Sequence, residues 1–297
     1  MRNTFINVLI EEAKKDDRIC LITPDMGYSV VENFQTLFPD RFFNVGIAEQ
    51  NAVGVAAGLA LSGKIVYVYS IVPFVTMRCF EQIRVDVAYM NTNVRLIGIG
   101  AGLSYGPAGA THHSIEDIAI MRALPNMTVC CPGDPVEVKE IIKQSVLYNG
   151  PMYIRLGKNG EPNIHPENQK IEIGKGIKMT EGDDLMLITT SNMLEQGQLL
   201  VKELLNEGKR ATLISMPTIK PFDSEIVIES LKNHTVIYTL EEHSKIGGLG
   251  SAVAEVIAEN GLGIKLKRIG INDEFTHKIG SQNYLRKKLI FDNVEIR

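Results

Sequence analysis

Short apolar runs and amphipathic segments alternate along this chain. The runs at 18–23, 64–70 and 95–100 are mostly apolar, which is typical of strands that are buried on both faces of a parallel sheet. Between the runs, segments such as 3–15 and 77–90 repeat their apolar residues at helical spacing. Strands that alternate with helices in this way predict an α/β fold with mainly parallel sheets.

The alternation is interrupted once, at 162–176. This segment has two prolines and alternating polar residues, so it is predicted to be a linker. We therefore predict two three-layer α/β domains with mainly parallel sheets, at 1–161 and 177–297. The remaining expected strands lie at 129–131, 153–156, 185–190, 211–215, 235–240 and 264–269, and the remaining expected helices at 30–38, 114–123, 135–148, 193–207, 223–231 and 249–260.

One stretch, 41–63, differs from the rest of the pattern. A short apolar run turns at Gly46 and becomes a helix dense in small residues, with Glu49 in its first turn. No basic residue lies beside Glu49 in the sequence, and a carboxyl group in apolar surroundings holds its proton more tightly. Glu49 is therefore either a proton donor with a raised pKa or an exposed acid at the positive end of a helix.

The same helix carries Gly54 and Gly58 four residues apart. Glycine inside a helix costs about 0.5–1 kcal/mol relative to alanine, so its presence calls for a compensating contact. We expect the backbone of another helix to pack closely on this face. Glu49 would then lie at the end of the helix pair.

Composition narrows the class of protein. The 297 residues are 44% hydrophobic and 22% charged, with a net charge of −4, which is ordinary for a globular protein and argues mildly against a nucleic-acid surface. No apolar run is long enough for a membrane span, and the N-terminus does not resemble a signal peptide. The four cysteines, none at CxxC spacing, predict buried thiols in a reducing compartment, so a cytoplasmic protein is expected.

Other candidate motifs carry less chemistry. GIGAG at 98–102 follows a strand, but neither a completed GxGxxG nor a following helix supports dinucleotide binding. The glycines at 247–250 open a helix that could hold an anion, yet the two acids before them favour a structural or interface loop. His112 and His113 have no metal-binding spacing, and neither is assigned to a metal site.

Three stretches resemble transketolases. GIAEQNAVGVAAGLALSG at 46–63 resembles the glutamate-bearing motif of the pyrimidine-binding domain in transketolases and 1-deoxyxylulose-5-phosphate synthases. GPAGATHHSIEDIAIMRALPNMTVCCPGDPVEV at 106–138 resembles the end of that domain. LEEHSKIGGLGSAVAEVIAENG at 240–261 is similar to the family's C-terminal domain, so the resemblance covers almost the whole chain.

The resemblance implies thiamine diphosphate as the cofactor. In the family, the glutamate at the position of Glu49 hydrogen-bonds the aminopyrimidine ring and promotes loss of the proton that activates the cofactor. An aromatic residue stacks on that ring, and Phe74 matches its position, with Phe80 as the rival. Asp25 matches an acid near the cofactor across a subunit interface.

Substrate-binding positions also match. The histidine in the place of His112 contacts the sugar and belongs to the catalytic set, and Arg2, Ser29 and Lys158 match positions that hold the sugar or its phosphate. The family usually has arginine where Lys158 stands, so the charge is kept and the bidentate fork is lost.

Two departures concern specificity. Gly100 stands where many transketolases have a substrate histidine, and Ala108 where they have an aspartate that reads a sugar hydroxyl. Loss of a buried polar partner weakens hydroxyl discrimination. Donors or acceptors other than the pentose-phosphate sugars therefore remain open.

The diphosphate half of the cofactor site is missing from the sequence. Thiamine enzymes hold Mg²⁺ through a GDG motif, and the nearest strings here, GDP at 133–135 and GDD at 182–184, do not match it. No metal ligand is therefore assigned to this chain. A full transketolase is about twice as long, so the resemblance implies a split enzyme whose N-terminal subunit supplies the Mg²⁺ and diphosphate site, with α2β2 as the expected assembly.

The leading hypothesis is the C-terminal subunit of a split transketolase, which moves a two-carbon ketol unit from a ketose phosphate to an aldose. One alternative is the β subunit of a 2-oxoacid dehydrogenase E1 component, which shares this layout. Another is a non-catalytic scaffold subunit of the same fold.

Overall fold

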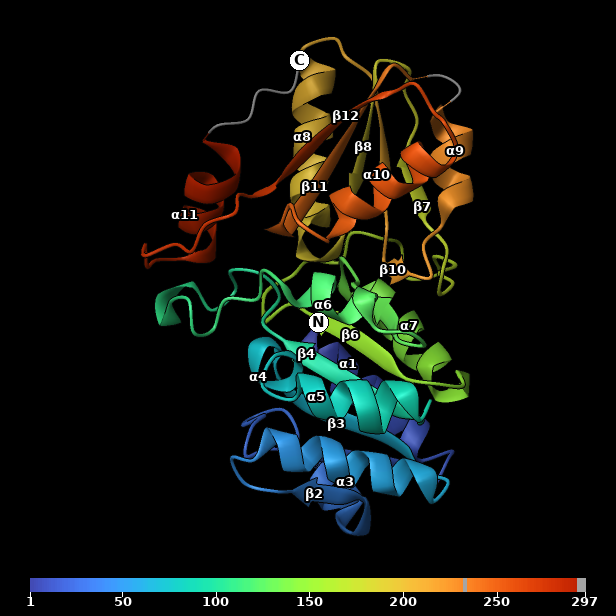
Figure 1. The fold of residues 1–297 in the computed structure, drawn as a ribbon, viewed down its shortest axis with the longest axis vertical. Coiled ribbons are helices and arrows are strands. Elements are labelled where there is room, and N and C mark those ends of the chain that lie inside the picture. The colour runs from blue at the N-terminus through green and yellow to red at the C-terminus, as the bar shows by residue number, and fades with distance from the viewer. Residues whose placement is uncertain (232–233, 293–297) are drawn as a thin grey trace.

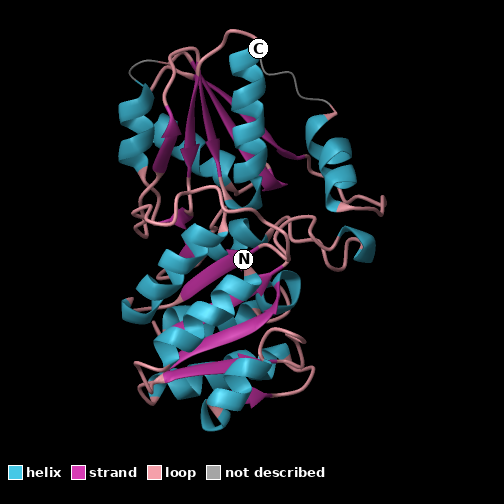
Figure 2. Ribbon diagram, turned by 180° about the vertical axis from the view of Figure 1, so that it is seen from behind, coloured by secondary structure: helices cyan, strands magenta, loops and turns pink. Residues whose placement is uncertain are grey.

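In the computed structural model, which describes residues 1–231 and 234–292, the chain forms two α/β units that are each built on one sheet (Figure 1). Helices cover both faces of each sheet (Figure 2). The first sheet has the strand order β10-β5-β6-β4-β3-β1-β2, and the second has the order β12-β11-β8-β9-β7. Only the β10–β5 and β7–β9 pairs are antiparallel among the described strands, so the predicted fold class is confirmed.

The first sheet contains β1 (Ile19–Thr23), β2 (Phe42–Asn44), β3 (Ile65–Ile71), β4 (Val94–Ile99), β5 (Thr128–Cys130), β6 (Met152–Leu156) and β10 (Thr218–Lys220). The helices that accompany it are α1 (Arg2–Ala13), α2 (Glu32–Leu37), α3 (Glu49–Leu61), α4 (Val72–Thr76), α5 (Phe80–Gln82), α6 (Asp117–Ala123) and α7 (Pro135–Leu147). The second unit contains β7 (Ile177–Thr180), β8 (Leu185–Thr189), β9 (Ala211–Ser215), β11 (Val236–Ser244), β12 (Lys265–Ile271), α8 (Leu194–Asn206), α9 (Ser224–Leu231), α10 (Leu249–Glu259) and α11 (Gln282–Arg286).

Several details differ from the sequence-based expectations. A short helix that was not among the expected elements, α4, contains Phe74, and Pro73 suits the first turn of this helix. The expected helix at 77–90 consists of α5 and a π-helical segment, Ile83–Tyr89. Strand β10, from the second half of the chain, pairs with β5 at the edge of the first sheet, a crossing that local patterns do not encode.

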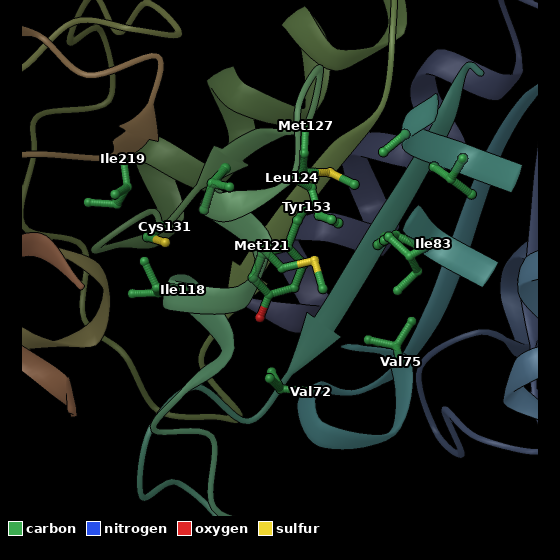
Figure 3. Close-up of a cluster of buried hydrophobic side chains, with 14 of the residues drawn as sticks. Val72, Val75, Ile83, Ile118, Met121, Leu124, Met127, Cys131, Tyr153 and Ile219 are labelled. Carbon is green, nitrogen blue, oxygen red and sulfur yellow. The ribbon is translucent and has the colours of Figure 1, made fainter. Parts of the chain in front are cut away.

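One hydrophobic core joins the two units. A single buried cluster contains Val72 and Met121 from the first unit and Ile188, Ile214 and Val253 from the second. Figure 3 shows the part of this cluster around Met121, together with Ile219 of β10. The first sheet and the second unit therefore share this part of the core.

A buried ionic network also connects the units. The Arg155 guanidinium, on β6, donates to Asp117 of α6 at 2.8 Å and reaches into the second unit, to Ser191 Oγ at 2.9 Å and the Glu242 carbonyl at 3.1 Å. Glu242 in turn pairs with Arg286 of α11 at 2.8 Å. These charges have lost their water, so each depends on its partners.

The start of α10 is occupied by a side chain of the protein itself. Glu241 lies within β11, and its carboxylate accepts from the backbone N–H groups of Leu249 and Gly250 at 2.7 and 2.8 Å. This contact satisfies the helix N-terminus that the glycines at 247–250 had suggested as an anion site. The acids before the glycines are thus structural, and they lie in a strand instead of a loop.

The segment 162–176 is fastened to α7. Asp134 caps α7 and accepts from the backbone N–H groups of Ile164 and His165, each at 2.8 Å. The His165 ring lies between two carboxylates, with Nδ1 3.3 Å from Asp134 and Nε2 3.5 Å from Glu137. Glu137 also accepts from Ser215 of β9 at 2.6 Å, so this cluster links both units to the segment between them.

Glu137→Gln is expected to change how stability depends on pH. Burial raises the pKa of Glu137 from 4.5 to about 7, while the nearby His165 charge opposes the rise. Between these two values the folded state binds more protons than the unfolded state, so the contribution of Glu137 to stability falls as pH rises from about 4.5 to about 7. Urea unfolding across this window should show the variant gaining stability relative to the wild type as pH rises. A difference that stays constant with pH would contradict the assignment.

Within residues 1–231 and 234–292, no helix combines the length and apolar character that a membrane crossing would need. The four cysteines are all buried and free of disulfides, as expected.

Candidate active site

The candidate site lies at the carboxyl ends of β1, β3 and β4. Parallel strands present these ends at one edge of a sheet, and ligands of open α/β sheets bind there. The segments that follow the three strands carry most of the residues singled out from the sequence. A row of side-chain contacts runs along this edge from Glu49 to Lys158.

Glu49 is the first residue of α3, and only 4% of its surface is exposed. This burial excludes the exposed first-turn acid that the sequence left open. The expectation of a carboxyl group without a counter-charge is wrong, because Arg78 reaches it with Nη1 2.8 Å from Glu49 Oε2. Arg78 lies beyond α4, far from Glu49 in the sequence, so neighbouring residues gave no sign of the pair.

The glycine face of α3 is open. No atom of the described chain lies within 4 Å of where a Cβ would stand on Gly54 or Gly58. The expected helix pair is therefore wrong for this chain by itself. Ile47 and Leu61, at the two ends of the helix, are 80% and 63% exposed, so this surface is apolar and uncovered by the described residues.

Phe74 connects Glu49 to the next part of the row. The Arg78 guanidinium lies 4.4 Å from the centre of the Phe74 ring. The His112 ring packs against the Phe74 ring edge to face, with the two ring centroids 5.2 Å apart. Phe80 is also half-buried, but it packs against the hydrophobic core. Of the two aromatic candidates, Phe74 is the one that shares partners with the site.

The row continues through Tyr105, a residue that the sequence analysis did not select. The Tyr105 ring lies 5.9 Å from the His112 ring, and Lys158 Nζ lies 4.4 Å from its centre. Gly100 has φ +93°, and a Cβ at this position would collide with the Tyr105 ring. Tyr105 thus fills the space beside Gly100. The only signal available in the sequence was an aromatic residue within the glycine-rich loop.

Arg2, Asp25 and Ser29 lie around the end of β1. Arg2 lines a cavity of about 180 Å³ together with Tyr105. Asp25 exchanges two hydrogen bonds of 3.1 Å with Asn44. Ser29 is exposed and does not line that cavity. The structure therefore places Arg2 beside Tyr105, at the end of the row of contacts. Asp25 and Ser29 do not line the cavity and lie outside this row.

The residues suit one end of thiamine diphosphate and not the other. A buried carboxylate and a half-buried aromatic ring that both contact Arg78 would suit a pyrimidine, which needs a hydrogen-bond partner and a stacking surface. Among the described residues, however, no group of three or more His, Cys, Asp or Glu side chains is placed to hold a metal. Asp134 is used by α7 and the segment after β6, and Asp183 is paired with Arg210. The donors that a Mg²⁺–diphosphate needs are not offered by this part of the chain.

Two family models together match almost the whole chain. Residues 1–161 match the pyrimidine binding domain of transketolase, and residues 174–296 match the transketolase C-terminal domain.

Individual relatives have the same extent as this chain. A protein of Methanocaldococcus jannaschii described as a transketolase C-terminal section is 44% identical over 93% of this chain and 87% of its own length. The 6-deoxy-6-sulfo-D-fructose transketolase subunit SqwH of a Clostridium species is 38% identical over 97% of this chain and 89% of its own. A solved structure described as a split gene transketolase, inactive β4 tetramer, is 37% identical, with a TM-score of 0.90 over 98% of this chain and 94% of that one.

Proposed function

The chain belongs to the transketolase family, and from this premise we propose that it is the C-terminal subunit of a split, thiamine-diphosphate-dependent transketolase. It would transfer a two-carbon ketol unit from a ketose phosphate to an aldose acceptor. The observation that carries the proposal is the buried Glu49 carboxylate at the start of α3, which is linked to Phe74 through Arg78. The β subunit of a 2-oxoacid dehydrogenase and the scaffold remain the competing outcomes of the test below.

When bound, thiamine diphosphate would supply the nucleophilic carbon that carries the two-carbon unit. Arg78 holds Glu49 Oε2, so Oε1 would be the atom that exchanges a proton with a nitrogen of the pyrimidine. Phe74 would offer its ring as a stacking surface for the pyrimidine. His112, which contacts Phe74, would hold and protonate oxygen atoms of the sugar, and Lys158 would balance a negative charge further along it.

A second chain is part of the proposal. The uncovered glycine face of α3 and the lack of a diphosphate site among the described residues both support an N-terminal subunit that docks beside Glu49 and brings the Mg²⁺ ligands. The related β4 tetramer is described as inactive, which supports the need for such a partner. An α2β2 assembly is the expected form.

The test is reconstitution with a candidate N-terminal subunit in the presence of thiamine diphosphate and Mg²⁺. Ketol transfer from a ketose phosphate should appear in the mixture and be absent from each chain alone. Turnover of 2-oxoacids in place of ketose phosphates would overturn the proposal in favour of a dehydrogenase subunit. A mixture in which Glu49→Gln leaves turnover unchanged would favour the scaffold.

Phe74→Leu is expected to weaken binding of thiamine diphosphate to the assembled enzyme by roughly tenfold, since an aromatic stack contributes about 0.5–1.5 kcal/mol beyond its buried area. Phe80→Leu is the matched control, because Phe80 packs into the core. Calorimetric titration of both variants separates the two positions. A larger loss for Phe80→Leu would reverse the assignment.

Lys158→Met is expected to raise KM for phosphorylated sugars roughly tenfold or more, with a smaller effect on kcat, because a charge-assisted contact made in the ground state is lost. Lys158→Arg keeps the charge and should stay close to the wild type. Steady-state kinetics with both variants test this. An unchanged KM for Lys158→Met would remove Lys158 from the site.

A further inference from the structure

One loop, residues 102–114, carries both Tyr105 and His112. It consists of turns and one short 3₁₀ helix, and it returns to its own start, where the Ser114 N–H donates to the Gly102 carbonyl at 2.8 Å. We call this closing point, Gly102 with Ser114, the neck of the loop. Loops are generally more mobile than the strands that they follow, so the positions of the two rings depend on what holds the neck.

The neck is held by Glu242 of β11, in the second unit. The Glu242 side chain is buried and packs directly on Gly102, where a Cβ would lie 2.5 Å from Glu242 Cγ. Arg155 binds both sides of this contact, since its Nη2 donates to the Ser114 carbonyl at 2.8 Å and to the Glu242 carbonyl at 3.1 Å. The start and the end of the loop are therefore both fastened to the same residue of the second unit.

Two side chains of α11 orient the Glu242 carboxylate. Arg286 donates to its two oxygens at 3.1 and 2.8 Å, and a bidentate pair of this kind fixes the orientation of the carboxylate as well as its distance. Gln282 Nε2 lies 2.9 Å from Glu242 Oε2. Gln282 also donates to Ser104 Oγ at 3.1 Å, and Ser104 precedes Tyr105 in the loop. Gln282 thus connects the carboxylate to the residue next to Tyr105.

The loop connects Glu242 to the candidate active site. Burial lowers the pKa of His113, while the Glu242 carboxylate opposes the fall, so the Glu242 charge acts on the residue next to His112. The His112 ring lies 5.9 Å from the Tyr105 ring and packs against Phe74. A displaced neck would therefore move both rings of the loop relative to Phe74.

We propose that Glu242, oriented by Arg286 and Gln282, is a positioning residue that fixes the 102–114 loop and so places His112 and Tyr105 for contact with the sugar. This inference rests on the proposed function and deepens it, because it gives the second unit a part in the reaction. A misplacement of about 1 Å can cost about 100-fold in rate. Glu49 and Phe74 lie on α3 and α4, outside the loop, so binding of thiamine diphosphate should not depend on Glu242.

Two variants test the proposal in the full chain assembled with its partner. Glu242→Gln keeps the size of the side chain and removes the charge that Arg286 pairs with, and it should lower kcat/KM for the sugar roughly 10- to 100-fold. Gln282→Leu acts at a partly exposed residue, so the chain should fold. It breaks the bonds to Ser104 and to the carboxylate and should lower kcat/KM roughly fivefold. In both variants the Kd of thiamine diphosphate should stay within about twofold of the wild type.

Two controls separate positioning from lost stability and from lost contact between the units. Arg95→Met removes a buried guanidinium whose partners are the carbonyls of Ser145, Tyr148 and Gly150, outside the loop. Glu255→Gln breaks another contact between the units, to Arg122 of α6 at 3.0 Å. Both controls should leave kcat/KM within about twofold of the wild type. A loss in Arg95→Met as large as that in Glu242→Gln would show that stability alone explains the effect and would overturn the proposal.

Amide hydrogen exchange of the full chain reports the loop without turnover. Peptides that cover 102–114 should exchange faster in Glu242→Gln and Gln282→Leu than in the wild type, and at the wild-type rate in Glu255→Gln. Unchanged exchange in both test variants, or a cofactor affinity that falls as far as kcat/KM, would overturn the positioning role. Wild-type turnover of 2-oxoacids in place of sugars would overturn the proposed function, while the exchange result still decides the positioning role. The two failures are thus distinguishable.

Discussion

Glu49→Gln is expected to lower ketol transfer by the reconstituted enzyme roughly 10²–10⁴-fold, the usual contribution of a positioned proton-transfer group. The amide keeps the size of the side chain and can still contact a pyrimidine nitrogen, but it cannot exchange a proton. Because Glu49 is 4% exposed at the start of α3, the loss cannot be replaced by a neighbouring acid on the surface. Turnover should be measured at saturating cofactor, so that weaker binding does not imitate slower chemistry.

The control is Glu81→Gln, which neutralises an exposed acid on the adjacent helix α5. It should leave turnover within about twofold of the wild type, because surface substitutions of this kind have small effects. Assembly with the partner, measured by sedimentation, should be the same for both variants. Near-normal turnover of Glu49→Gln in an intact assembly would remove Glu49 from the chemistry.

Arg155→Met is expected to lower the free energy of unfolding by about 3–5 kcal/mol, the usual cost of removing one partner from a buried ion pair. Asp117 would remain fully buried without its counter-charge, and the bonds that Arg155 makes across the units, to Ser191 Oγ and the Glu242 carbonyl, would be lost. Urea unfolding should therefore show a large loss, with the two units no longer unfolding in one transition.

Arg95→Met is the matched control for the expected loss of a single unfolding transition. Arg95 is equally buried, but its guanidinium donates to the carbonyls of Ser145, Tyr148 and Gly150, all within the first unit. Its loss should destabilise the protein while leaving the coupling of the units intact. A loss of less than about 1 kcal/mol for Arg155→Met would show that the network carries little of the stability between the units.

The sequence predicted those features that depend on local pattern. Buried strands such as β3 and β4 can be recognised in the sequence as apolar runs. The helix after Gly46 was predicted from its many small residues. Strand β10 was missed because three residues beside a proline carry no strand period, and its partner β5 lies far away in the sequence.

The site residues likewise fall into two groups: those that a local sequence pattern predicts, and those that only the folded chain brings together. Glu49 stood out because a lone acid opens an apolar helix, but Arg78 was not expected as its partner, since only the fold brings them together. Tyr105 was missed for a related reason. Its ring occupies the space left by the missing side chain of Gly100, and this contact exists only once the loop is folded. The roles of Arg2, His112 and Lys158 came from family resemblance, and the structure places all three next to Tyr105.

The most direct test of a shared active site is calorimetric titration of thiamine diphosphate with Mg²⁺, first into this chain alone and then into its mixture with the N-terminal subunit. Binding that appears only in the mixture is predicted, because no group of His, Cys, Asp or Glu among the described residues is placed to hold the metal. Tight, Mg²⁺-dependent binding to the chain alone would contradict the account, since it would mean that one chain holds both ends of the cofactor.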